Sequence, residues 1–159
     1  MGAGVDDFDL TVRLEIYRHF ASTGGRPAVQ QMAAKVAADP RAVREAYARL
    51  YGRRVLVLEP DGASIRMAPP FSGVPTMHRV ESDGVSYFAN CAWDALGIPA
   101  ALHRPATVHS RCAQSLEPFV LEVGLSGPPA SAPESAQGSE WLFHCLVPAA
   151  HWWDDIVFT

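Results

Sequence analysis

Residues 39–52, DPRAVREAYARLYG, are the stretch that decides the fold of the N-terminal half. Asp39 is a typical N-cap, and Pro40 fits the first helical position, where its missing N–H costs nothing. The apolar side chains that follow return at helical spacing; they are Val43, Ala46, Tyr47 and Leu50. The pattern predicts an amphipathic helix that begins after Asp39 and ends at Gly52.

Two helices are predicted before this one and a hairpin after it. The first covers residues 10–20, with an apolar stripe of Leu10, Leu14, Ile16, Tyr17 and Phe20. Pro27 opens a second, short helix whose apolar face holds Val29, Met32, Ala33 and Val36. Residues 55–58 and 63–67 are predicted to be strands around a Pro-Asp-Gly turn. Three helices followed by a hairpin is the order of a winged helix-turn-helix.

The chain is predicted to divide at a linker rich in proline and glycine, residues 69–75. A winged-helix-like module, residues 8–68, precedes the linker, and a second module, residues 76–159, follows it. The second module is predicted to contain short strands at 80–81, 85–88, 106–110 and 119–123, and a helix from Cys91 to Leu96 that Pro99 limits. The expected class is α+β, with a mixed or antiparallel sheet and short helices.

The amino-acid composition predicts a folded, soluble protein. Of its 159 residues 48% are apolar and 19% charged, and no apolar run is long enough to cross a membrane. The acidic N-terminus does not resemble a secretory signal, so the expected compartment is the cytoplasm. Three cysteines without a secretory context favour reduced thiols over a disulfide framework.

Nucleic-acid binding is disfavoured by the charge of the chain, which is −4. The third helix and its end nevertheless carry arginines that could contact phosphates: Arg41, Arg44, Arg49, Arg53 and Arg54. The same side chains, interleaved with Glu45, also fit a solvated helix face. DNA binding therefore remains the less favoured interpretation of the N-terminal module.

Cys91 and Asp94 are the residues most able to carry chemistry. A cysteine at the start of a helix lies where free N–H groups favour a thiolate. Asp94, three residues later, returns to the same face and could exchange a proton with the thiol. The plainer alternative is a buried thiol and a surface carboxylate.

The run Tyr87-Phe-Ala-Asn-Cys91-Ala-Trp-Asp94-Ala-Leu96 resembles the alkylmercury (organomercurial) lyase family, and so do residues 106–112, which end in Cys112, and residues 119–123. The resemblance implies that Cys91 attacks mercury. It also implies that Asp94 takes the thiol proton and then protonates the departing carbon. Soft thiolates suit a soft metal, which agrees with these roles. The resemblance makes Cys112 structural.

The family's second catalytic cysteine follows a segment that residues 152–159 resemble, so it would lie beyond Thr159 and the module is expected to be C-terminally incomplete. A truncated chain, a residue not represented in the sequence and a loss of lyase activity all stay open as explanations. Cys145 is the remaining candidate for the second mercury ligand, with core packing as its alternative. His144 and His151, near Trp152 and Asp155, could bind a transition metal or simply pack.

The expected function is that of a carbon–mercury lyase, if the site is complete. No resident cofactor is expected, because mercury is substrate and product. The expected partners are small organometallic compounds and low-molecular-weight thiols that release the product; no membrane partner is expected, and the oligomeric state stays open. Two alternatives remain: a non-enzymatic metal- or thiol-responsive winged-helix regulator, and a family member that acts on another thiophilic metal.

Overall fold

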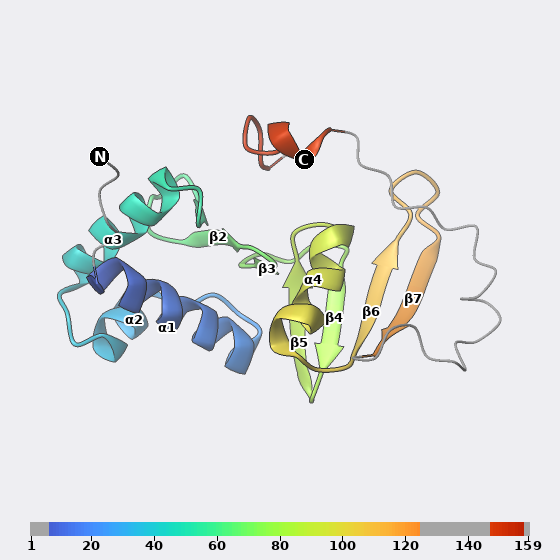
Figure 1. Ribbon diagram of the computed structural model, residues 1–159, viewed down its shortest axis with the longest axis horizontal. Helices are drawn as coiled ribbons and strands as arrows, with labels where there is room; N and C mark the ends of the chain where they lie inside the picture. The colour runs from blue at the N-terminus through green and yellow to red at the C-terminus, as the bar shows by residue number, and fades with distance from the viewer. Residues whose placement is uncertain (1–6, 125–146, 158–159) are drawn as a thin grey trace.

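The computed structural model describes residues 7–124 and 147–157 (Figure 1). Its helices are α1 (Asp7–Thr23), α2 (Val29–Lys35), α3 (Pro40–Gly52) and α4 (Ala92–Leu102), with a short 3-10 helix η1 (Ala149–His151). Its strands are β1 (Val57–Leu58), β2 (Ile65–Ala68), β3 (Phe71–Ser72), β4 (Arg79–Ser82), β5 (Val85–Ala89), β6 (Ala106–Arg111) and β7 (Pro118–Val123). Within the described residues they form one antiparallel sheet in the order β1-β2-β3-β5-β4-β6-β7. The predicted α+β class is confirmed.

α3 begins and ends where the sequence predicts. The Asp39 carboxylate accepts a hydrogen bond from the Arg41 backbone N–H at 2.7 Å, which satisfies one of the free donors at the helix start. All four predicted apolar residues of its stripe are buried. α2 begins two residues after Pro27, and the Gln31 side chain accepts a hydrogen bond from the Ala28 backbone N–H at 2.9 Å.

α1 buries Ile16 and Phe20 of the predicted stripe but exposes its other two aliphatic residues. Leu10 and Leu14 are 42% and 47% exposed. The buried stripe consists of Asp9, Val12, Ile16 and Phe20, which also have helical spacing. The predicted helix begins at residue 10 and so leaves out Asp9, because a charged residue is rarely fully buried without a partner.

The partners of Asp9 come from the far end of α3. The Arg49 guanidinium donates hydrogen bonds to the Asp9 carboxylate from Nη2 at 2.7 Å and from Nε at 3.0 Å. Arg53 donates a further hydrogen bond to it at 3.3 Å. Asp9 itself is fully buried. This fork of charge-assisted hydrogen bonds compensates for the buried charge and ties α1 to α3.

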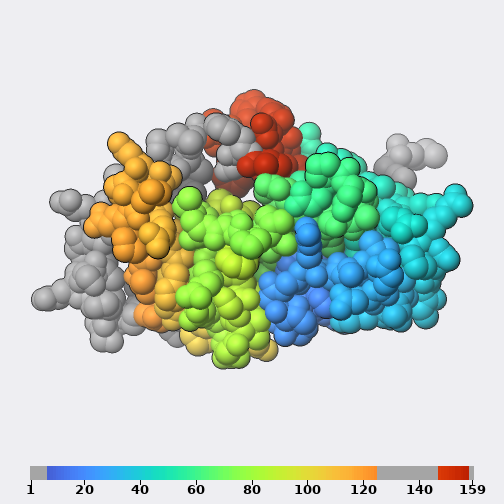
Figure 2. All heavy atoms as spheres, turned by 180° about the vertical axis from the view of Figure 1, so that it is seen from behind, coloured from blue at the N-terminus to red at the C-terminus, as the bar shows by residue number. Residues whose placement is uncertain are grey.

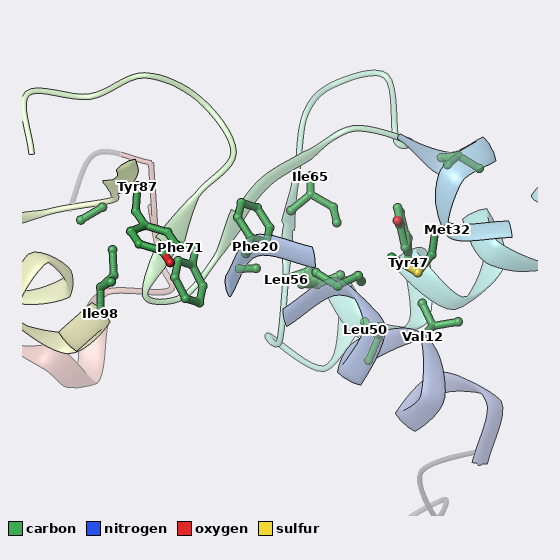
Figure 3. Packing of buried hydrophobic residues seen from close by; sticks show 14 of the residues in the cluster. Val12, Phe20, Met32, Tyr47, Leu50, Leu56, Ile65, Phe71, Tyr87 and Ile98 are labelled. Carbon is green, nitrogen blue, oxygen red and sulfur yellow. The ribbon is translucent and has the colours of Figure 1, made fainter. Parts of the chain in front are cut away.

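The helices and the sheet share one core, in which Phe71 of β3 is central (Figure 3). Its ring stacks on Phe20 of α1 with centroids 5.4 Å apart and meets Tyr87 of β5 at 5.6 Å. β3 lies inside the segment predicted as a linker and pairs with β2 on one side and β5 on the other. The predicted linker therefore forms a strand that joins β2 to β5 in one sheet. The division into two modules stays a prediction.

α4 packs against β4, β5 and β6 (Figure 1). The expectation that Pro99 limits this helix is wrong, because α4 continues to Leu102 with Pro99 buried inside it. The proline lacks the N–H that would bond one turn back, and packing of the apolar helix on the sheet offsets that loss. None of the helices in the described part of the chain has the length and apolarity needed to span a membrane.

Replacing Asp9 with Ala should lower the free energy of unfolding by about 2 kcal/mol, because Arg49 and Arg53 lose a buried partner while staying partly hydrated. Urea denaturation at neutral pH measures the change. Asp7→Ala is the matched control, since Asp7 is an exposed carboxylate in the same first turn of α1. Equal stability of the two variants would contradict the structural role of Asp9.

Candidate functional site

The candidate site lies where β5 ends and α4 begins. Cys91 is the N-cap of α4, with extended backbone angles of φ −149° and ψ 179°, and its carbonyl oxygen accepts the first helical bond from Ala95 N at 3.0 Å. Its side chain is half-buried. The thiol therefore stands at the amino end of the helix, as the sequence predicts, where the backbone N–H groups favour negative charge.

Asp94 turns back toward Cys91 from the third position of α4. Its carboxylate accepts a hydrogen bond from Asn90 Nδ2 at 2.9 Å. Burial raises the pKa of the Asp94 carboxyl above the usual aspartate value, and the bonds from Asn90 and Cys91 lower it in part. The pair can exchange a proton directly, and the carboxyl retains that proton more readily than an exposed aspartate does.

Asn90 is a site residue that the sequence did not reveal. Its Nδ2 also donates to the Pro70 carbonyl oxygen at 3.3 Å. The neighbouring carbonyl, that of Pro69, accepts a hydrogen bond from the Tyr17 hydroxyl of α1 at 3.1 Å. No sequence pattern links residues 17, 69, 70 and 90, because only the folded chain brings them together.

Tyr17 brings α1 into the electrostatic surroundings of the site. Burial raises the pKa of its hydroxyl, the Arg13 guanidinium lowers it, and the negative charge of Asp94 raises it. Arg13 lies 5.8 Å from the centroid of the Tyr17 ring. α1 thus interacts electrostatically with Asp94 through Tyr17.

α4 also exposes two large apolar side chains. Trp93 and Leu96 are 56% and 41% exposed, and their separation of three residues puts them on one face of α4. Positions one or two residues apart on a helix do not face each other, so this apolar face differs from the one that carries Cys91 and Asp94.

Cys112 directly follows β6. It is half-buried in the turn to β7, and the Ser115 backbone N–H donates to its sulfur at 3.5 Å. Hydrogen bonds from the Ser115 side chain and from the backbone of Ser115 and Gln114 lower the pKa of the thiol. Cys112 therefore makes the contacts of a turn residue and is not part of the hydrophobic core.

The remaining candidate ligands have different outcomes. Cys145 and His144 lie outside the described residues. His151 is in η1, with Nδ1 3.0 Å from an Asp154 carboxylate oxygen. Across residues 7–124 and 147–157 the structure contains no cluster of three or more histidine, cysteine or acidic side chains that could hold a metal. Segment 147–157 lies at the upper edge of the molecule in both views (Figures 1 and 2).

Comparison with known proteins gives two matches. A family model described as alkylmercury lyase (MerB) matches residues 71–157, more than half of the chain. The solved structure of the mercury-bound form of MerB2 has a TM-score of 0.57 and 24% sequence identity, and the match covers 76% of this chain and 63% of that one. The chain thus spans less than two thirds of that structure's length. No curated protein matches the chain.

Asp94→Asn should raise the free energy of unfolding at neutral pH, because burial disfavours the charged carboxylate. The native pKa is raised, so the penalty is complete above that pKa and disappears below the unfolded value, where both states are protonated. The gain should therefore shrink as the pH falls from 7 toward 3. Chemical denaturation at several pH values measures it, and a gain independent of pH would contradict this origin.

Proposed function

The chain belongs to the alkylmercury lyase family, and from that premise we propose that it cleaves the carbon–mercury bond of small organomercury compounds. The observation that carries the proposal is the placement of Cys91 at the N-cap of α4 with the half-buried Asp94 carboxylate three residues later, where the Cys91 side chain is one of the groups that lower the pKa of that carboxyl. A thiolate is the ligand that mercury prefers, and a carboxyl with a raised pKa is a suitable proton donor. Both groups lie within one helical turn.

The reaction begins with transfer of the thiol proton of Cys91 to Asp94. The resulting thiolate attacks the mercury of R–Hg–X and displaces X⁻, which forms a sulfur–mercury bond. Asp94 is now neutral, and burial favours that neutral form. The first half of the reaction thus stores one proton beside the bound R–Hg group.

In the second half, Asp94 gives this proton to the carbon attached to mercury. The electron pair of the carbon–mercury bond becomes the new carbon–hydrogen bond, so hydrocarbon R–H leaves, Asp94 is again a carboxylate and Hg(II) stays on Cys91.

Release of Hg(II) requires further thiolate ligands. Low-molecular-weight thiols can supply them and carry the metal away as a bis-thiolate, which returns Cys91 for another cycle. Cys145 as the second protein ligand stays a prediction, since it lies outside the described residues.

The regulator alternative receives less support from the arginines of α3 and its end. Arg49 and Arg53 are bound to buried Asp9, and Arg41 pairs with Glu45 at 3.0 Å. These ion pairs compete with phosphate contacts. A preference for another thiophilic metal remains the other alternative, and competitive titration of Cys91 with mercury and copper compounds would reveal it.

Asp94→Ala should retain mercury but slow hydrocarbon release at least 100-fold, because the proton donor is lost while the thiol remains. Cys91→Ser should abolish release, and any mercury that it still binds is then held by another thiol such as Cys112. The measurement is single-turnover benzene formation from phenylmercury with a stoichiometric amount of reduced protein and excess small thiol, alongside the intact mass of the adduct.

Cys112→Ser is the matched control, because it removes a different half-buried thiol without touching Asp94. Its release rate should stay within about twofold of the unmodified chain, as expected for a surface change. Benzene formation by Asp94→Ala at the original rate would refute the role of the carboxylate. An adduct without benzene in the unmodified chain would refute lyase activity.

A further inference from the structure

The side chain of Asn90 joins the reactive pair to the rest of the fold. Its single amide nitrogen donates to Asp94 Oδ2 at 2.9 Å and to the Pro70 carbonyl oxygen at 3.3 Å. An amide nitrogen has two hydrogens, so both are used. Asn90 therefore spans from the loop between β2 and β3 to the first turn of α4.

The Pro70 carbonyl determines which way the amide points. A carbonyl oxygen accepts hydrogen bonds and cannot donate them, so only the NH₂ group can face it. A reversed amide would place Asn90 Oδ1 against two oxygens, those of Pro70 and Asp94. The NH₂ group is thereby held toward the carboxylate, and the carboxylate is held in turn.

This orientation has a stability cost. Asn90 Oδ1 is buried and has no hydrogen-bond partner within the described residues. A buried acceptor without a partner typically costs about 1–3 kcal/mol. Unsatisfied groups of this kind are rare in the interior and are expected where geometry serves a site.

The Pro69–Pro70 segment, to which Asn90 donates its hydrogen bond, is fixed from two sides. The Tyr17 hydroxyl donates to the Pro69 carbonyl oxygen at 3.1 Å. From α4, Gly97 approaches so closely that a Cβ there would lie 3.2 Å from Pro70 Cβ. The residues that hold Asn90 are consequently packed between α1 and α4.

We propose that Asn90 is a positioning residue, which fixes the Asp94 carboxyl beside Cys91 by bridging it to the Pro70 carbonyl. This inference rests on the proposed lyase function for its kinetic consequence. Protonation of a carbon requires a donor at a defined distance and angle, so a carboxyl free to rotate should deliver its proton more slowly. Attack of the thiolate on mercury does not need the bridge.

The kinetic test separates these two steps. In Asn90→Ala and Asn90→Asp, single-turnover benzene release from phenylmercury should fall about tenfold or more, while the Cys91 adduct still forms in full. Asn90→Asp preserves the shape and loses the donor. Asn90→Gln, which keeps an NH₂ group on a longer side chain, should release benzene faster than Asn90→Ala.

Thr76→Val is the matched structural control. The Thr76 hydroxyl donates to the Ala89 carbonyl oxygen at 2.7 Å, so its loss loosens the same end of β5 without touching Asp94. Its benzene release should stay within about twofold. Release at the original rate by Asn90→Ala, or an equal loss in Thr76→Val, would overturn the proposal.

A spectroscopic arm is independent of activity. Asn90 is the chain's single asparagine, so selective ¹⁵N labelling gives one side-chain NH₂ signal. Asp94→Ala should shift that signal, and Thr76→Val should leave it in place; an unmoved signal in Asp94→Ala would overturn the bridge. If the unmodified chain releases no benzene, the proposed function fails and this arm alone decides the role of Asn90. The same labelling experiment decides the role of Asn90 in the case that the Asn90 variants do not fold.

Discussion

The packing of Phe71 between α1 and β5 is the interaction on which the arrangement depends. Its ring contacts Tyr17 and Phe20 on one side and Tyr87 on the other, all within 6.4 Å between ring centroids. The Tyr87 hydroxyl donates to the Ala21 carbonyl oxygen at 2.8 Å and adds a polar contact to the apolar one. These contacts set where β5 ends, and the end of β5 sets where Cys91 stands.

Two kinds of constraint meet at the site. The relation between Cys91 and Asp94 is local, because three residues of helix bring them to one face. The relation between Asp94 and its surroundings is tertiary, because Asn90, which donates to Asp94, also donates to the Pro70 carbonyl oxygen of a distant loop. Chemistry that needs both a nucleophile and an oriented proton therefore depends on a short motif and on the complete fold.

The difference between local and tertiary constraints also explains how much the sequence could predict. The cap and stripe of α3, the hairpin after it and the reactive turn were all accessible, because periodicity and capping report local structure. The buried face of α1 was not, since Asp9 is buried only through arginines about 40 positions away. The extent of α4 was missed because packing on the sheet outweighed the effect of Pro99. The role of Asn90 has no sequence pattern at all.

The placement of Cys91 and Asp94 within one helical turn has a consequence for how such chains diverge. Substitutions in the sheet or in the N-terminal helices can shift the walls around the pair, but they leave the spacing from Cys91 to Asp94 unchanged, because helix geometry sets it. Sequence drift can therefore proceed far while the fold is kept, as the 24% identity to the mercury-bound MerB2 structure illustrates. A change in the ligand bound beside Cys91 and Asp94 can therefore arise from substitutions in the surrounding residues alone.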